Sequence, residues 1–158
     1  MSEKIKDRPL IIASPPSIFF ACLIAGGILH ALFRATLGGF PEAIRTGSGI
    51  ILLSTAGIIA ASAFLVLHQH KTPYNPYKAT TRIAQKGVFR FTRNPMYLSL
   101  ALLLAAIALL ANAFSFVIMT ILFVVIINRG VIQPEEAYLE KKFGAEYRAY
   151  LDKVRRWL

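Results

Sequence analysis

Two short polar segments of this 158-residue chain contain residue types that can bind a charged small molecule. In the first, Arg93 precedes Asn94-Pro95, a pair that favours a helix start because Asn is a common N-cap and Pro suits the first helical position. A helix N-terminus beside an Arg also attracts anions. In the second, Glu135 and Glu136 either complement the dipole of a new helix or accept hydrogen bonds from a cation or a ribose diol.

These carboxylates stand out because acidic residues are scarce. No Asp or Glu occurs between Ala43 and Pro134, and 56% of all residues are hydrophobic. Long uncharged stretches of this kind are typical of membrane proteins. The net charge of +10 comes from Lys and Arg at the ends of the apolar stretches, which is the positive-inside pattern and argues against nucleic-acid binding. Cys22 lies in an apolar stretch and has no second Cys with which to form a disulfide.

The apolar stretches predict four membrane helices, each of which needs roughly 20 apolar residues to span. The uncharged stretch from Pro95 to Asn128 would be about 50 Å long as one helix, so it must fold back, and Ala111-Asn112-Ala113 is the expected turn. An interfacial lead-in covers residues 1–16. The predicted membrane helices are residues 17–37, 48–67, 96–111 and 114–132, the last two forming a short hairpin.

The distribution of Lys and Arg predicts the orientation. The N-terminal tail, the loop over residues 68–95 and the C-terminal segment are rich in these residues, whereas the expected hairpin turn has none. This pattern places both termini and the loop in the cytoplasm, with a bacterial inner membrane as the expected location. Residues 134–158 form a cytosolic amphipathic helical tail that begins at Pro134 and is interrupted at Phe143-Gly144. The predicted fold is a single-domain, all-α integral membrane protein.

The two polar motifs occur in a recognisable order. Arg-Asn-Pro-x-Tyr at residues 93–97 is followed by the hairpin and then by Glu-Glu-x-x-Leu-x-x-x-Phe-Gly-x-x-Tyr-x-x-Tyr at residues 135–150. Over residues 71–158 the chain resembles the isoprenylcysteine carboxyl methyltransferase and phospholipid methyltransferase superfamily, in particular its short bacterial members. The resemblance implies a membrane-embedded methyltransferase that uses S-adenosylmethionine. Its expected partners are membrane lipids and a lipophilic substrate that enters from the bilayer.

The resemblance also assigns roles to residues. Arg93 and Glu135 are the residues whose loss is expected to abolish activity. The chemistry of the cofactor suits such residue types, since Arg binds a carboxylate, Glu binds an ammonium or ribose hydroxyls, and an aromatic face attracts a sulfonium. Methyl transfer is an in-line displacement, in which positioning does much of the catalysis. The cofactor pocket is expected to include Gly87, Asn94, Pro95, Tyr97, Glu136, Tyr147 and Arg155.

One departure from the family pattern leaves the substrate class open. Carboxyl methyltransferases usually have His at the position of Asn94, and Asn cannot act as a general base near neutral pH. The acceptor is therefore a carboxylate, a thiol or an amine. Two other interpretations are an NADPH-dependent membrane reductase of related architecture and a small four-helix transporter or binding protein. A transporter would be expected to keep an ionisable residue at mid-membrane, and no Asp or Glu lies there.

The histidines add little to the predicted chemistry. His68 and His70 form an H-x-H pattern, but no Cys, Asp or further His nearby completes a set of ligands, so we expect no metal site. His30 and Arg34 are four residues apart near the outer end of the first membrane helix. Snorkelling of these side chains towards the interface is the simpler interpretation there.

Overall fold

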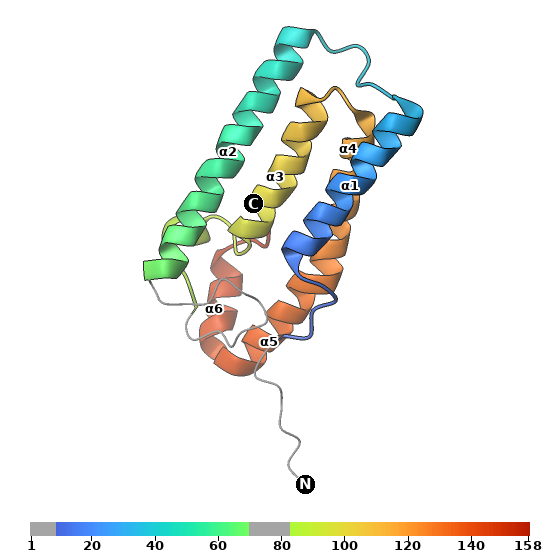
Figure 1. The fold of residues 1–158 in the computed structure, drawn as a ribbon. Coiled ribbons are helices and arrows are strands. Elements are labelled where there is room, and N and C mark those ends of the chain that lie inside the picture. Colours follow the sequence, from blue (N-terminus) through green and yellow to red (C-terminus); the bar gives the residue numbers. More distant parts are fainter. Residues whose placement is uncertain (1–8, 70–82) are drawn as a thin grey trace.

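The computed structural model describes residues 9–69 and 83–158, which form helices and connecting loops without a strand (Figure 1). Four helices form a bundle, and two shorter helices follow at one end of it. A 3₁₀ turn covers Gly87–Arg90, and a π-helical turn covers Asn128–Ile132. The α-helices are α1 (Pro15–Phe33), α2 (Glu42–Gln69), α3 (Pro95–Leu110), α4 (Phe114–Ile127), α5 (Gln133–Phe143) and α6 (Ala145–Lys153).

The helix lengths fit a membrane protein. Among the described residues, three continuous helical runs are long and apolar enough to cross a bilayer, namely Pro15–Phe33, Glu42–Gln69 and Phe114–Phe143. The helix α3 is apolar but has 16 residues, about 24 Å of helix, whereas a hydrocarbon core is about 30 Å thick. The chain is therefore an integral membrane protein with three helices of spanning length and a shorter fourth one.

The bundle is built from two helix pairs. The helix α2 packs along α3, and α1 packs along α4, while the contact between α3 and α4 joins the pairs (Figure 1). The outward faces of α1 and α2 are apolar, as expected for surfaces that touch lipid acyl chains. Exposed side chains on these faces include Phe20, Ile24, Ile51, Ile58 and Phe64.

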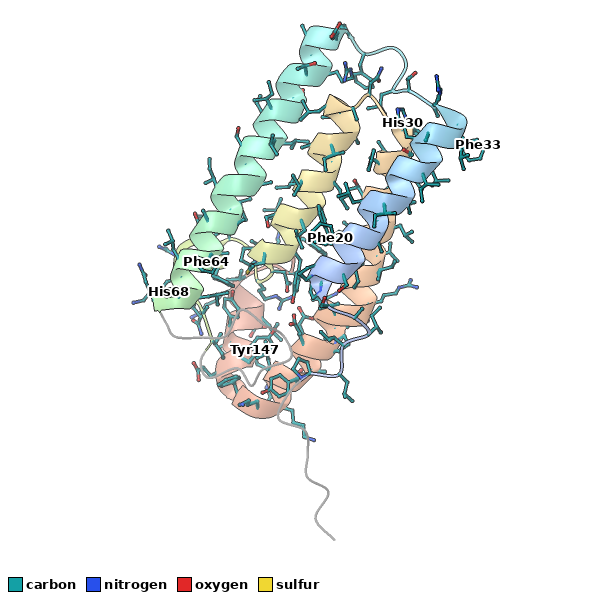
Figure 2. The ribbon with its side chains drawn as sticks, viewed as in Figure 1. Phe20, His30, Phe33, Phe64, His68 and Tyr147 are labelled. Carbon is teal, nitrogen blue, oxygen red and sulfur yellow. The ribbon has the colours of Figure 1, made fainter. Side chains whose placement is uncertain are left out.

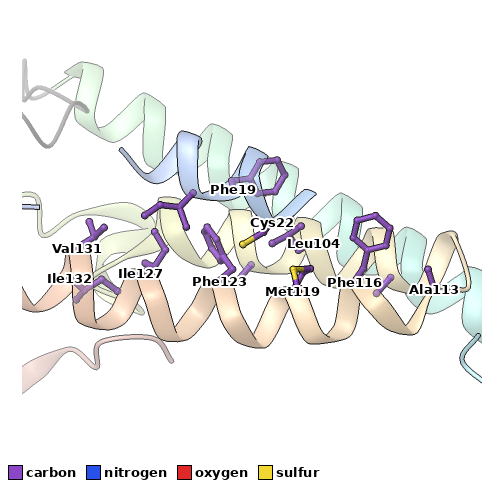
Figure 3. Packing of buried hydrophobic residues seen from close by; sticks show 13 residues of the cluster. Phe19, Cys22, Leu104, Ala113, Phe116, Met119, Phe123, Ile127, Val131 and Ile132 are labelled. Atoms are coloured by element: carbon purple, nitrogen blue, oxygen red, sulfur yellow. The ribbon is translucent and has the colours of Figure 1, made fainter. Parts of the chain in front are cut away.

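Small residues set how closely the helices approach one another. A Cβ added at Gly26 of α1 would lie 2.6 Å from Cδ1 of Phe116, so only Gly fits against this ring. The buried residues of α2 are Gly49, Ala56 and Ala63, which recur every seven positions and let α2 approach α3 closely. The larger side chains of the core come from α1, α3, α4 and the π-helical turn (Figure 3).

The first helix begins at Pro15, two residues before its predicted start. Ser14 accepts a hydrogen bond from the Ser17 N–H at 3.2 Å, and the proline pair occupies the first helical positions, where a missing N–H costs nothing. The helix ends at Phe33, four residues before its predicted end. The reason is that Arg34 adopts the left-handed conformation with φ 49°.

The turn between α3 and α4 falls at Asn112, where the sequence predicts it. Asn112 has φ 51°, a left-handed conformation that Asn tolerates better than most residues. Its side-chain oxygen accepts a hydrogen bond from the Leu37 N–H at 3.0 Å. Nearby, Arg45 of α2 donates to the last two carbonyl oxygens of α3. We call this the hairpin end of the bundle, and the opposite end, which carries α5 and α6, the tail end.

The predicted helix start at Pro134 lies one residue after the start of α5 at Gln133, but α5 is not a separate helix, because the backbone stays helical from Phe114 to Phe143. In the π-helical turn, the N–H of the residue before Pro134 donates to a carbonyl five residues earlier. Pro134 itself has no N–H to offer the carbonyl of Gly130. That carbonyl accepts instead from the Ile12 N–H at 3.1 Å. A wider turn thus accommodates the proline, and the freed carbonyl binds the N-terminal segment.

The chain changes direction twice beyond this point. The predicted break after Phe143 is present, and Gly144 makes it with φ 54°, a value that favours Gly. After α6, Val154 has the extended conformation (φ −128°, ψ 130°). Residues Val154–Leu158 then run back towards the start of α3, and we call them the C-terminal strap.

Candidate functional site

The C-terminal strap docks against the segment that leads into α3. The backbone N–H of Arg93 donates to the Arg155 carbonyl at 3.1 Å. The side chains of Thr92 and Asn94 donate to the Arg156 carbonyl at 3.2 and 2.9 Å. Asn94 holds the predicted N-cap position of α3, but its side chain makes no capping hydrogen bond, because it is bound to the strap. The start of α3 is thereby joined to the end of the described chain.

Two arginines meet at one carboxylate beside this contact. Glu136 accepts from Arg93 Nη2 at 3.1 Å and from Arg156 through Nε at 3.1 Å and Nη2 at 2.6 Å. Asn128 Oδ1 accepts from Arg156 Nη1 at 3.3 Å. The hydrogen bonds to Glu136 raise the pKa of Arg156, so its guanidinium stays charged. We call Arg93, Glu136 and Arg156 the arginine cluster, and two guanidinium groups against one carboxylate give it a formal charge of +1.

Glu135 lies apart from this cluster, beside the transmembrane core. Both of its carboxylate oxygens are 2.9 Å from the hydroxyl of Tyr97, in the first turn of α3. The ring of Tyr97 packs against the main hydrophobic core. Within residues 9–69 and 83–158, no basic side chain forms an ion pair with Glu135. Burying a carboxylate without an opposite charge is costly, so a cationic ligand group would complement Glu135.

Two tyrosines of α6 cover the site on its polar side. Tyr147, which Figure 2 shows at the tail end, and Tyr150 form a small second core. The hydroxyl of Tyr150 donates to the Phe89 carbonyl at 2.7 Å and ties α6 to the 3₁₀ turn. Burial raises the pKa of Tyr150 to about 12, although the charge of Arg93 opposes the shift. Burial raises the pKa of Tyr147 as well, and the negative charge of Glu136 adds to the effect. Both phenols therefore stay neutral near pH 7.

The structure does not bring every predicted site residue to the same place. Gly87 has φ 57°, and a Cβ added there would lie 2.8 Å from Cγ2 of Val66, so this Gly allows close approach to α2. The side chain of Arg155 is exposed, and its backbone carbonyl takes part in strap docking. Pro95 is buried at the first position of α3. The predicted residues that do gather at the tail end are Arg93, Asn94, Tyr97, Glu135, Glu136 and Tyr147.

Thr92, Asn128 and Arg156 are site residues that the sequence interpretation missed. Val154 has the extended conformation, and the strap bends again at Arg156. Val154 is buried and Arg156 reaches the cluster, whereas Arg155 between them is exposed. The local sequence does not distinguish Arg156 from Arg155, because the choice depends on how the strap docks against Thr92 and Asn94.

The histidines lie away from this site. His68, at the end of α2, stacks on Phe64 with ring centroids 6.1 Å apart (Figure 2), and His70 lies outside the described residues. His30 lies towards the hairpin end, and its buried Nδ1 has no hydrogen-bond partner among the described residues. In the part of the chain that the structure describes, no three His, Cys, Asp or Glu side chains are arranged to hold a metal ion.

Fold and site together define a class of protein, an all-helical membrane protein with a charged site at one end of its bundle. A profile of the phospholipid methyltransferase family matches residues 44–146, which is more than half of the chain. The protein belongs to this family of membrane methyltransferases, as the motifs predict. The match includes α3, α4 and α5 and ends before the strap. The chain is also similar to an uncharacterized protein of Haemophilus influenzae, with 53% identity over 64 residues, 40% of this chain and the whole of that relative.

Proposed function

We propose that the protein is an S-adenosylmethionine-dependent methyltransferase whose substrate is a lipophilic or membrane-dissolved small molecule. Its membership of the phospholipid methyltransferase family supports the reaction type. We further propose that the tail end of the bundle faces the cytoplasm, with both termini on that side of a bacterial inner membrane. Support for this orientation comes from Lys and Arg residues, which concentrate in the segments at the tail end.

The separation of opposite charges at the site is the observation that carries this proposal. The arginine cluster has a formal charge of +1, and Glu135 has no ion-pair partner among the described residues. The amino-acid part of S-adenosylmethionine has one carboxylate and one ammonium group, which complement these two places. The ring of Tyr97, in contact with Glu135, offers an aromatic face for a sulfonium. The residues present therefore fit the cofactor.

The residues of the site act by binding and positioning. Arg93 would hold a carboxylate, and Glu135 would accept hydrogen bonds from an ammonium or from ribose hydroxyls. The cofactor, when bound, supplies an electrophilic methyl on a sulfonium sulfur, which becomes a neutral thioether as the methyl bonds to the acceptor. Tyr147 packs in the small second core beside the site, and the strap docks against the segment that leads into α3, so both hold the polar side of the site in place. Because in-line displacement depends on alignment, this arrangement contributes through orientation.

The acceptor molecule would reach the site from the bilayer. Tyr97 lies between the apolar core and the polar site, since its ring packs on the transmembrane core while its hydroxyl contacts Glu135. The side chain of Asn94 is bound to the Arg156 carbonyl and takes up no proton near neutral pH. A carboxylate or thiolate acceptor needs no base at the transfer step, whereas a protonated amine must first lose a proton. All three acceptor classes are therefore compatible with the site.

Calorimetric titration of the purified, detergent-solubilised protein with S-adenosylhomocysteine, with NADPH in parallel, tests the proposed function. Saturable binding of S-adenosylhomocysteine alone would support the methyltransferase. Binding of NADPH alone would favour the membrane reductase instead. Binding of neither would contradict both enzymatic interpretations and favour a transporter or binding protein.

The variant Glu135→Gln tests the pocket itself, because it keeps the shape of the side chain and removes the charge. We expect it to abolish binding of S-adenosylhomocysteine while the protein stays folded in detergent. Glu140→Gln is the matched control, since Glu140 lies in the same helix and forms a surface contact with Arg148 at 4.0 Å. Wild-type affinity in Glu135→Gln would contradict the proposed pocket.

A further inference from the structure

The two adjacent glutamates of α5 have different surroundings. Successive residues of a helix point about 100° apart, so they face different neighbours. In Glu136, Oε1 accepts from both Arg93 and Arg156, and Oε2 accepts from Arg156. In Glu135, both oxygens share a single neutral partner, the hydroxyl of Tyr97. Glu136 is thus already satisfied within the protein, whereas Glu135 is the carboxylate that remains available to a ligand.

We propose that Glu136 is the scaffold of a two-arginine binding site for a carboxylate, and that Arg156 of the C-terminal strap is a ligand-binding residue of this site. This inference rests on the proposed function. It assigns the carboxylate of the proposed cofactor to Arg93 and Arg156 together, and it removes Glu136 from the groups that bind a cation.

The charge of the arginine cluster supports this assignment. Two guanidinium groups converge on one carboxylate, so one positive charge has no ion-pair partner among the described residues. The Nε atom of Arg93 is also buried and has no hydrogen-bond partner among the described residues. A partly buried charge without a partner and a buried donor without an acceptor are both unfavourable. An anionic ligand group would neutralise the charge of the cluster and accept a hydrogen bond from the unused donor. Arginine suits a carboxylate because its planar fork matches the two oxygens.

The way in which Arg156 is held supports a binding role as well. Its side chain is 34% exposed, against 11% for Arg93 and 15% for Glu136, so it lies on the open side of the cluster. Its guanidinium is fixed by Glu136 and Asn128, and its backbone carbonyl is fixed by Thr92 and Asn94. A long side chain that is fixed before binding loses little conformational entropy when a ligand arrives.

The test uses two ligands that differ in one group. S-adenosylhomocysteine has the carboxylate, whereas its decarboxylated analogue keeps the nucleoside and the ammonium. In Arg156→Gln we expect the affinity for S-adenosylhomocysteine to fall about 10- to 100-fold, as for the loss of charged hydrogen bonds, and the affinity for the analogue to change less than about twofold. Arg148→Gln is the matched control, because it removes the same charge from an exposed side chain of α6 outside the site and should change neither affinity.

Each outcome of these titrations has a definite meaning. Equal losses for both ligands in Arg156→Gln would show a merely structural role and overturn the inference, as would wild-type affinity for S-adenosylhomocysteine. Absence of any nucleoside binding in the wild-type protein would overturn the proposed function, and the inference with it. Loss of the carboxylate preference in Arg156→Gln alone would support both.

A folding control is built into the chain. Trp157 is its single tryptophan, follows Arg156 directly and packs against the main core, so its fluorescence reports whether the strap stays docked. We expect a wild-type emission spectrum in Arg156→Gln. If the emission spectrum shows that the strap is undocked in Arg156→Gln, the affinities for the two ligands are compared in Arg156→Lys instead. It keeps the positive charge without the fork, and an affinity for S-adenosylhomocysteine below that of wild type, with the analogue unchanged, would again support the inference.

Discussion

The hairpin end and the tail end of the bundle both hold half-buried polar side chains, but the partners of these side chains differ between the two ends. At the hairpin end, Arg45 donates to two backbone carbonyls at the end of α3, and Asn112 accepts from the Leu37 N–H. At the tail end, two arginines meet at Glu136, and Glu135 has no ion-pair partner among the described residues.

The polar side chains of the hairpin end have a structural role, whereas those of the tail end form the proposed binding site. The last carbonyls of any helix lack partners within the helix, so Arg45 and Asn112 complete the backbone of the hairpin. At the tail end, Glu135 and one of the two guanidinium groups lack an opposite charge among the described residues, which lowers stability. Such local conflicts are expected where a protein binds a ligand that completes them. The comparison predicts that variants at the tail end will weaken ligand binding, whereas variants at the hairpin end will lower stability and leave binding unchanged.

The largest expected effect comes from removing one arginine at each end. Arg93→Ala should weaken binding of S-adenosylhomocysteine more than about 100-fold, because it removes the proposed carboxylate donor and unbalances Glu136. Arg45→Ala should leave that affinity unchanged and lower the free energy of unfolding by about 1–2 kcal/mol, because two carbonyls lose their donor. Calorimetric titration and thermal unfolding in detergent measure the two quantities. A similar loss of binding in both variants would contradict the division between the ends.

A smaller effect is expected from a methyl group in the α1–α4 contact. Gly26→Ala places a Cβ against the buried ring of Phe116 and should lower the free energy of unfolding by about 1–3 kcal/mol. Gly27→Ala is the matched control, because nothing lies within 4 Å of a Cβ added there. Thermal unfolding compares the two, and equal stabilities would show that α1 can shift away from α4 without cost. Ligand affinity should be unchanged in both variants.

The hairpin turn should respond more weakly. Asn112→Ala removes the acceptor of the Leu37 N–H and puts a less tolerant residue at φ 51°, so the free energy of unfolding should fall by about 1 kcal/mol. Asn112→Gly loses the same hydrogen bond but keeps the backbone conformation, and its loss should be smaller. A greater loss in the Gly variant would contradict this account of the turn.

Labelling tests which side of the membrane each end faces. In a Cys22→Ser background, a Cys at position 112 should react with a membrane-impermeant maleimide in intact cells. A Cys at position 140 should react only after the inner membrane is permeabilised. The reverse pattern would overturn the proposed orientation of the whole chain. Cys22 is buried in the bundle, and its replacement ensures that any labelling comes from the introduced Cys.

Local patterns predicted much of this architecture. Apolar stretches bounded by turn residues predicted the helices of the bundle, and Asn112 marked the hairpin turn because Asn tolerates the left-handed conformation. The type of Arg93 and of the two glutamates indicated a charged site at the tail end. Arg93, Glu135 and Glu136 all lie at the tail end, because the two motifs stand at the beginning and the end of the same helical hairpin.

The parts that sequence reasoning missed depend on contacts between distant segments. Arg155 and Arg156 are identical in type, and the docking of the strap on Thr92 and Asn94 decides which of them reaches Glu136. Asn94 reads locally as a helix cap, yet its side chain is engaged by the strap. The continuous helix through Pro134 depends on the wider turn before it, and the N-terminal segment supplies the donor for the freed carbonyl of Gly130.

The π-helical turn also sets the angular register of everything that follows it. The turn holds one residue more than the regular helix would at the same hydrogen-bonding step. Removing one residue from Asn128–Ile132 would rotate α5 by about 100° around its axis. Glu135 would then point away from Tyr97, and Glu136 away from both arginines, although every side chain of the site would still be present. The site is thus encoded by the count of residues before α5 as much as by their identity.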